Sequence, residues 1–105
     1  MQQHIKAYRE YFKIGEQDIT LCEVCSKPAN DIHHIYFRRH KTFELDGREY
    51  DIDDILNLIA LCRNCHEESH RGEFSKEFLI AVHKSKMIIF KARAAEIAKT
   101  KGMVL

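Results

Sequence analysis

Metal-binding side chains gather in three short stretches of this sequence. LCRNCHEESHRG, at residues 61–72, places two cysteines and two histidines within nine residues. LCEVC at residues 21–25 adds two cysteines, and DIHHI at residues 31–35 adds two histidines. A zinc ion in a protein usually takes four ligands, so these stretches offer more than one ordinary site needs. The surplus indicates two metal sites with different roles.

The cysteines form two C-x-x-C pairs, a spacing that lets two thiolates reach one ion from a single turn. We predict a closed, tetrahedral, structural zinc site made by Cys22, Cys25, Cys62 and Cys65. Such a site stabilises a fold and carries out no chemistry. The 36 residues between the two pairs exceed the spacing of a simple zinc ribbon, which indicates an insertion that contains DIHHI and Asn57.

Four histidines remain for a second site: His33, His34, His66 and His70. His66 and His70 are four residues apart, so on a helix they lie on one face and can bind the same ion. The other histidines are interpreted as ordinary surface or core residues: His4, His40 and His83. The two spaced pairs therefore favour a divalent-metal site beside the structural zinc.

The HEESH segment also fits the H-E-x-x-H pattern of zinc peptidases. In that class the glutamate, here Glu67, acts as general base, and a third ligand comes from a following helix. The helix predicted here is short, begins beside zinc-type cysteines and ends almost at once at Gly72. A peptidase is therefore the weaker hypothesis, and it predicts that Glu67 is essential.

Short elements must position these residues. Residues 3–14 carry apolar side chains at helical spacing, with Gly15 as a C-terminal cap. The β-branched and aromatic content of IHHIYF suits a strand, LNLIAL is a second short apolar run, and TFELDGREYDI predicts a hairpin around its Asp-Gly turn. A helix from Arg63 to Gly72 should then carry the paired histidines on one face.

The last segment predicts a long helical pattern, as one helix or two, that starts after the N-cap Ser75 and ends at Gly102. Most of its lysines should face water. Its predicted buried stripe consists of Phe78, Leu79, Val82, Ile89, Phe90 and Ile97.

Length and composition indicate one globular domain of 105 residues, with 45% hydrophobic and 31% charged residues. The N-terminus lacks the apolar core of a signal peptide, and no segment has the length and apolarity of a membrane span. We therefore expect a cytoplasmic protein with reduced, metal-binding cysteines. A secreted disulfide protein is the alternative.

The net charge of +1 decides nothing about nucleic acid, but the charges are unevenly distributed. The segment from Lys76 to Lys101 contains seven basic and two acidic residues, whereas ELDGREYDIDD contains six acidic residues and one arginine. A basic helix face alone is weak evidence for a phosphate partner. It gains weight only beside a catalytic site.

Taken together, CEVC, DIHHI and NLIALCRNCHEESH resemble the HNH endonuclease family, in its zinc-stapled branch with two C-x-x-C pairs. The resemblance implies an α+β fold with a small ββα-metal (His-Me finger) core, in which two strands and a helix hold one divalent ion. A four-cysteine zinc site would staple this core, and N-terminal and C-terminal helices would flank it. The predicted single nuclease domain, 1–105, comprises a helix and lead-in at 1–21, the core at 22–72 and a helical segment at 73–105.

The resemblance also implies roles for individual residues. His34 would be the general base, and Asn57 would hold it in its working orientation. His33, His66 and His70 would bind the catalytic ion, which would be Mg²⁺, Mn²⁺, Ni²⁺ or Zn²⁺, while a separate Zn²⁺ occupies the cysteine site. Asp31 has no fixed role and is a candidate neighbour of a ligand. The implied reaction is hydrolysis of DNA phosphodiester bonds to 5′-phosphate and 3′-hydroxyl ends.

The implied partner is double-stranded DNA, bound by a monomer or a homodimer. Candidate phosphate contacts are Arg38, Arg39, Arg63, Arg71 and the C-terminal lysines. Nucleases of this type are frequent in phages and mobile elements. One setting that the resemblance implies is therefore a phage that encodes the protein, which then acts in the host cytoplasm. The main alternative is a non-catalytic zinc module that binds nucleic acid or protein, with the histidines as remnants.

Overall fold

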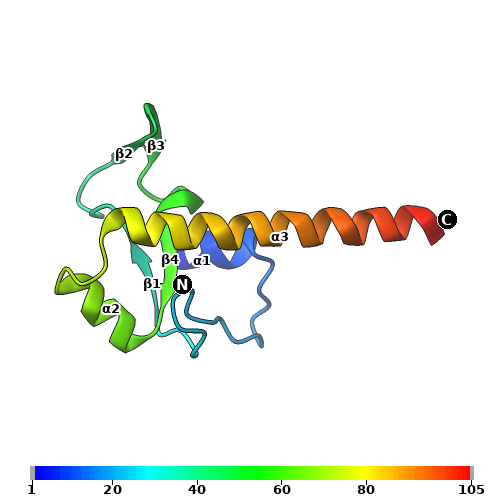
Figure 1. The fold of residues 1–105 in the computed structure, drawn as a ribbon, viewed down its shortest axis with the longest axis horizontal. Coiled ribbons are helices and arrows are strands. Elements are labelled where there is room, and N and C mark those ends of the chain that lie inside the picture. The colour runs from blue at the N-terminus through cyan, green and yellow to red at the C-terminus, as the bar shows by residue number, and fades with distance from the viewer. Residues whose placement is uncertain (1, 105) are drawn as a thin grey trace.

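The computed structural model describes residues 2–104, with side chains described through residue 99. The body is α+β, with three α-helices and two small antiparallel sheets within the described residues, so the predicted fold class is confirmed. The elements in chain order are α1 (Gln3–Tyr11), β1 (Asp31–His34), β2 (Thr42–Leu45), β3 (Arg48–Asp51), the 3₁₀ turn η1 (Ile55–Asn57), β4 (Leu58–Leu61), α2 (Arg63–His70) and α3 (Lys76–Val104). The molecule measures 51 × 32 × 26 Å, because α3 extends well beyond the body (Figure 1).

Strand β4 is the centre of the body. All four of its residues are buried, which explains why the sequence is apolar without interruption from Leu58 to Leu61. The strand pairs antiparallel with β1 in a register that places His33 opposite Ile59. Successive strand residues face opposite sides. Ile59 accordingly packs in the cluster around the cysteines, while Leu58 packs with Tyr8 of α1 in a second cluster. Since α2 begins directly after β4, the strands and α2 form the ββα unit.

The acidic excursion folds as the predicted hairpin. β2 and β3 pair antiparallel around Asp46 and Gly47, which both have positive φ angles of 53° and 77°. Those angles suit the two-residue turn that the twist of paired strands prefers, and an Asp-Gly pair adopts them readily. At its base, the rings of Tyr36, Phe43 and Tyr50 stack in sequence with centroid separations of 5.1 and 5.4 Å. The hairpin projects away from the body (Figure 1).

A buried contact between Glu23 and His83 joins the cysteine turn to α3. Glu23, which lies inside the first C-x-x-C pair, places Oε1 2.8 Å from Nδ1 of His83, and both side chains are almost fully buried. The hydroxyl of Tyr8 donates to Oε2 of Glu23 at 2.6 Å, and Nε2 of His83 lies 2.6 Å from the carbonyl oxygen of Ile55. Burial, followed by the charge of Glu23, raises the pKa of Tyr8. The interpretation of His83 as a core residue is therefore confirmed.

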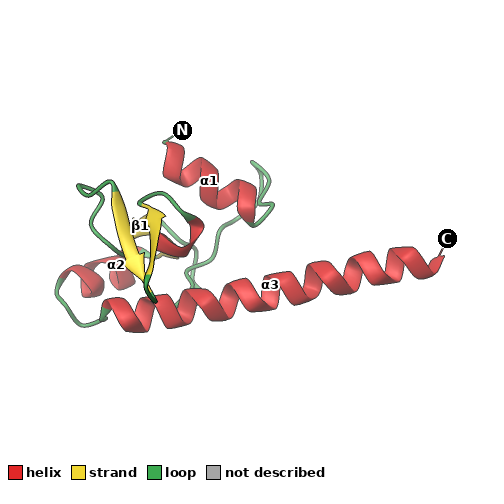
Figure 2. Cartoon of the chain, turned by 90° about the horizontal axis from the view of Figure 1, so that it is seen from above, coloured by secondary structure: helices red, strands yellow, loops and turns green. Residues whose placement is uncertain are grey.

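Helix α3 is one continuous helix of 29 residues, and its N-cap is Ser75, whose hydroxyl accepts from the backbone N–H of Phe78 at 3.0 Å. Figure 2 shows it passing along the body and continuing beyond it. Within residues 2–104 no helix combines the length and the apolar character that a membrane span requires.

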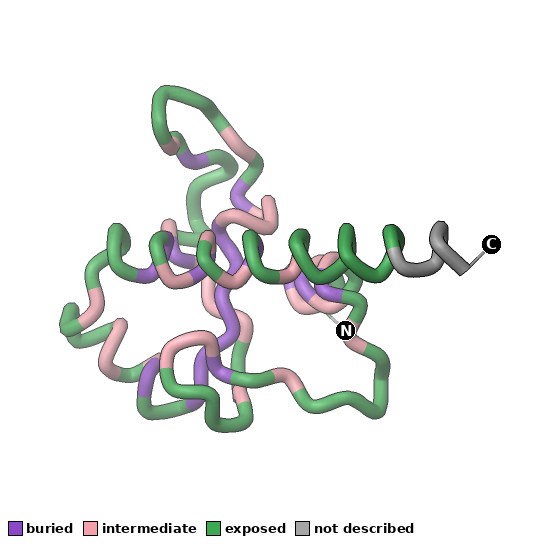
Figure 3. The backbone as a smooth tube through the Cα atoms, turned by 45° about the vertical axis from the view of Figure 1, so that its right-hand side comes forward, coloured by how far each residue is buried: buried purple, intermediate pink, exposed green. Residues whose placement is uncertain are grey.

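The predicted buried stripe of α3 is partly wrong. Leu79 is buried, but Phe78, Ile89 and Ile97 are 43%, 54% and 57% exposed. The buried positions of the helix are instead Leu79, Ile80, His83 and Met87. Ile97 is exposed because α3 extends beyond the body: residues 91–99 are exposed throughout (Figure 3). The helix also continues past the predicted end at Gly102, and the side chain of Lys101 lies outside the described residues.

The N-terminal helix also ends earlier than predicted. Helix α1 stops at Tyr11, and Lys13 takes a left-handed conformation with φ of 54°. Gly15 is therefore not the cap; its backbone N–H donates to Oδ2 of Asp18 at 2.7 Å.

Candidate metal centres and their cleft

The structure brings the four predicted cysteines together. The first pair lies in the turn closed by the bridge between Leu21 and Pro28, and the second pair lies at the N-cap and in the first turn of α2. All four Sγ atoms lie within 4.8 Å of one another, and Cys25 Sγ is 3.5 Å from Cys62 Sγ. Tetrahedral zinc places its sulfur ligands about 3.8 Å apart. The cluster, made of Cys22, Cys25, Cys62 and Cys65, can therefore hold a zinc ion.

The protonation chemistry of these thiols suits metal binding. All four are free thiols. The backbone N–H of Cys65 points at Sγ of Cys62 at 3.5 Å and lowers the pKa of that thiol to about 7, while burial raises the pKa of Cys65. Without a cation, neighbouring thiolates repel one another, so the four thiols cannot all ionise easily. A divalent cation stabilises several thiolates in one place and so favours the ionised form of all four.

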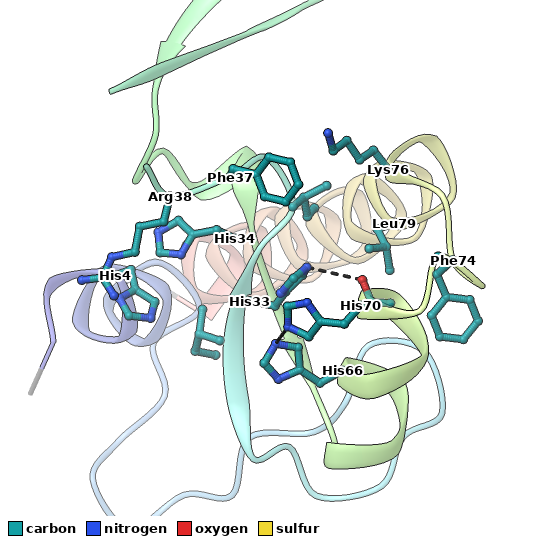
Figure 4. A pocket seen from close by; sticks show the side chains of 14 residues that line it. His4, His33, His34, Phe37, Arg38, His66, His70, Phe74, Lys76 and Leu79 are labelled. Atoms are coloured by element: carbon teal, nitrogen blue, oxygen red, sulfur yellow. Dashed lines mark hydrogen bonds between the residues drawn. The ribbon is translucent and has the colours of Figure 1, made fainter. Parts of the chain in front are cut away.

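The second cluster consists of one histidine from β1 and two from α2. Ligand atoms of His33, His66 and His70 all lie within 4.8 Å of one another. Nε2 of His66 is 3.0 Å from Nε2 of His70, and the ring of His33 lies 4.8 and 5.4 Å from the other two ring centroids. Imidazole ligands on one tetrahedral ion are separated by about 3.3 Å. The close approach of three rings therefore fits a shared divalent ion (Figure 4).

The surroundings of this cluster also suit ligation. Oδ2 of Asp31 lies 3.0 Å from Nδ1 of His66, a contact that leaves Nε2 of that ring free for a metal. Burial, followed by repulsion from His66 and His70, lowers the pKa of His33 to about 4. Its ring is therefore neutral at physiological pH, which is the form that binds metal. Nε2 of His33 also lies 3.4 Å from Oγ of Ser69.

His34 lies on the other side of β1 from His33 (Figure 4). Its Nε2 is 2.8 Å from Oδ1 of Asp53, its side chain is 8% exposed, and its ring centroid lies 4.6 Å from that of His4. The pKa of His4 is lowered by burial and then by His34. Sequence reasoning missed both Asp53 and His4 as neighbours of His34. No local pattern could have found them, because the three residues come from separate segments.

Asn57 is fully buried, and its hydrogen bonds go to the backbone and not to the ring of His34. Its side-chain oxygen accepts from the backbone N–H of Tyr36 at 2.6 Å. Its amide nitrogen donates to the carbonyl oxygens of Tyr36 and Ile52 at 3.2 and 2.8 Å. These bonds tie together the two chain segments that hold His34 and Asp53. Any effect of Asn57 on His34 is therefore transmitted through the backbone.

One cleft of about 590 Å³ joins both histidine groups (Figure 4). Its lining includes His33, His66 and His70, the predicted base His34, and the cations Arg38 and Lys76. The other candidate phosphate contacts lie outside this lining: Arg39, Arg63 and Arg71. Glu67, the base of the peptidase hypothesis, is exposed and also lies outside it.

Comparison with known proteins gives one family and one relative. The relative is the mitochondrial DNA mismatch repair protein mutS homolog of Sarcophyton glaucum, which is 36% identical over 58 residues. That match covers 54% of this chain but only 6% of the relative. No solved structure matches the chain. The model of the HNH endonuclease family matches residues 22–72, which contain the cysteine cluster, the histidine cluster, His34 and Asn57. The predicted resemblance to the HNH endonuclease family is therefore confirmed for residues 22–72.

Proposed function

We propose that this protein is a metal-dependent endonuclease that hydrolyses phosphodiester bonds of double-stranded DNA to 5′-phosphate and 3′-hydroxyl ends. One observation carries the proposal: a single cleft contains three histidines that can share an ion, a fourth histidine paired with a carboxylate, and two cations. Metal, base and phosphate contacts are the parts that hydrolysis of a phosphodiester requires.

In this proposal His33, His66 and His70 hold the catalytic divalent ion. The bound ion supplies positive charge next to the phosphate and the departing 3′ oxygen. Asp31 orients His66 by accepting a hydrogen bond from its Nδ1–H, which directs the other ring nitrogen into the cluster. The cysteine cluster holds the separate structural zinc and takes no part in the reaction.

His34 acts as the general base. With its proton on Nε2, the ring donates to Asp53 and keeps the lone pair of Nδ1 free. Nδ1 takes a proton from water as the water oxygen bonds to phosphorus. The bond from phosphorus to the 3′ oxygen breaks on the opposite side, and the departing 3′ oxygen takes a proton from solvent water to become the 3′-hydroxyl. The carboxylate of Asp53 stabilises the imidazolium that results, as the aspartate of a hydrolase triad does. Asn57 is a positioning residue that acts through the backbone.

Charge distribution supports DNA as the substrate. Arg38 and Lys76 line the cleft and can neutralise phosphates beside the scissile bond. The acidic β2–β3 hairpin projects from the body, where repulsion from the DNA is least (Figure 1). The name of the relative refers to DNA repair, which agrees with a DNA substrate.

The proposal extends to organisation and setting. Tyr8 and Phe12 near the N-terminus share a core cluster with Leu58 and with Met87 of α3, which supports one domain over residues 1–105 with 22–72 as its core. The free cysteines suit a reducing compartment such as the cytoplasm, including that of a phage host.

Cleavage of supercoiled plasmid tests the proposal. The purified protein is incubated with magnesium, manganese, nickel or zinc, and we expect nicked or linear products with at least one ion. His34→Ala should reduce the rate by about 10²- to 10⁴-fold, the usual contribution of a general base. His40→Ala is the matched control, because His40 is exposed and lies outside the cleft.

Two results would contradict parts of the proposal: the assigned base and the nuclease activity itself. Full activity of His34→Ala would remove the assigned base. No cleavage with any of the four ions, in a protein that still contains one zinc per chain, would favour the non-catalytic binding module. The peptidase is tested by Glu67→Gln, which should leave DNA cleavage unchanged because Glu67 lies outside the cleft lining.

A further inference from the structure

An aromatic side chain stands exposed at the cleft. Phe37 is 56% exposed, although it lines the same cleft as the histidines. Figure 4 places its ring beside the cleft, between His34 and Lys76. A single exposed apolar residue is common on protein surfaces. Its location next to the candidate reaction centre is what distinguishes this one.

Two cations accompany the ring. Nζ of Lys76 lies 4.7 Å from the ring centroid of Phe37, and Cζ of Arg39 lies 5.2 Å from it. Arg38, the next residue in sequence, lines the cleft. A cation over a ring is attracted by its π-electrons, which helps to hold both groups in place. The local surface therefore combines an aromatic face with concentrated positive charge.

The backbone that presents Phe37 is well tethered. The preceding residue, Tyr36, is bonded through both its N–H and its carbonyl oxygen to the buried side chain of Asn57. The carbonyl oxygen of Phe37 accepts from the backbone N–H of His40 at 3.1 Å, which closes a turn. These bonds hold the backbone at Phe37 beside the cleft, so that its exposed ring is presented there.

We propose that Phe37 stacks on an unpaired nucleobase of the DNA, and that the preferred substrate is duplex DNA with a mispaired or bulged nucleotide near the scissile phosphate. A nucleotide joins an aromatic base to an anionic phosphate, which matches the aromatic ring and its cations. In an intact duplex each base is covered on both faces by its neighbours, whereas an unpaired base can leave the stack. Stacking on an aromatic side chain then compensates for the lost neighbour.

This inference rests on the proposed function only for the scissile phosphate; base stacking itself needs no cleavage. Binding is therefore measured with the His34→Ala protein that contains one zinc per chain, and no further divalent ion is added. The probes are two fluorescent duplexes, one perfectly paired and one with a single bulged 2-aminopurine. We expect tighter binding to the bulged duplex and quenching of 2-aminopurine fluorescence as the base stacks on Phe37.

Substitutions then separate the ring from the charges. In the His34→Ala background, Phe37→Leu should lose about 5- to 100-fold in affinity for the bulged duplex, the range expected for one stacked base, and should lose the quenching. Phe37→Trp should keep both. Arg38→Gln should weaken binding to the two duplexes equally, because a phosphate contact does not read the base. Phe78→Leu is the matched control, since Phe78 is a partly exposed phenylalanine outside the cleft lining.

Equal affinity for the two duplexes, or a Phe37→Leu protein that still prefers and quenches the bulged one, would overturn the inference. Tight binding to the bulged duplex combined with absence of cleavage by the unsubstituted protein would instead reject the nuclease and leave the stacking role standing. The two failures are therefore distinguishable.

Discussion

The two metal clusters share helix α2 but differ in how they are closed. The cysteine cluster takes Cys62 and Cys65 from the N-terminal end of α2 and completes a set of four thiols with the turn at residues 22–25. The histidine cluster takes His66 and His70 from the following turns and adds only His33. One short helix thus supplies half of a closed site and most of an open one.

The number of ligands in each cluster supports the different roles that we propose for them. Four thiolates fill the tetrahedral positions of a zinc ion, and three of the four cysteines are buried, so no position remains for a substrate. Three imidazoles leave at least one position open, and that cluster lines a cleft with Arg38 and Lys76. The comparison shows that the two ends of α2 contribute to two differently built clusters, to which the proposed function assigns stability and chemistry.

The largest expected effect is loss of the closed site. Cys22→Ser removes a buried ligand, and the binding energy of a structural zinc contributes directly to folding. We expect the midpoint of thermal unfolding to fall by about 12 °C or more, or the cooperative transition to disappear. Circular dichroism measures the transition, and elemental analysis measures the zinc content. Ser26→Ala, in the same turn, serves as the control; an unchanged melting curve in Cys22→Ser would refute the structural site.

Loss of a ligand from the histidine cluster should impair DNA cleavage and metal binding but leave thermal stability nearly unchanged. His66→Ala should abolish DNA cleavage and weaken binding of the catalytic ion by about 100-fold or more, since one of three ligands is removed. The stability of the zinc-loaded protein should change little, because His66 is only partly buried. Titration calorimetry with Mn²⁺, paired with thermal unfolding, makes the comparison. If His66→Ala lowered the unfolding midpoint as much as Cys22→Ser, the division of roles along α2 would be wrong.

A neighbour of a ligand should have a smaller effect. Asp31→Asn removes the charge that faces Nδ1 of His66 at 3.0 Å, and losses of about 10- to 100-fold in metal affinity are typical of such contacts. Asp46→Asn, at the tip of the β2–β3 hairpin, makes the same chemical change far from the cluster in sequence. Mn²⁺ affinity measured for both variants decides the point: equal affinities would show that Asp31 does not orient the ligand.

The smallest expected effect is a shift of one titration. Without a divalent ion in the histidine cluster, the ring of His33 should titrate near pH 4, below its ordinary pKa of 6.5. The unfolded chain then binds this proton more readily than the folded one, so the stabilising effect of neutral His33 is complete above about pH 6.5 and is lost as the pH falls toward 4. NMR of the ring signal, identified by its absence in His33→Gln, reports the pKa. A value near 6.5 would contradict the burial of the ring.

Much of the candidate site follows from local sequence rules. The spacing of the C-x-x-C pairs and the four-residue interval between His66 and His70 set which side chains share a turn or a helix face. The Asp-Gly turn and the N-cap Ser75 are equally local, because each depends on backbone angles or hydrogen bonds within a few residues. These predictions needed no knowledge of packing, and the structure agrees with them.

Other contacts depend on segments far apart in the chain. Asp53 and His4 approach His34 only because α1 and the chain before η1 pack around β1. The bonds from the Asn57 side chain to the backbone of Tyr36 likewise form only when residues 36 and 57, which flank the β2–β3 hairpin, come together. These bonds hold the backbone at Phe37 beside the cleft.

The exposure of Ile97 on α3 has a similar origin, since periodicity predicts one face of a helix but not how far the body extends along it. Spacing along the chain therefore determines the ligand pairs. Packing between distant segments determines which residues surround His34 and where the ring of Phe37 lies, because a long-range contact depends on the whole chain and not on its nearest neighbours.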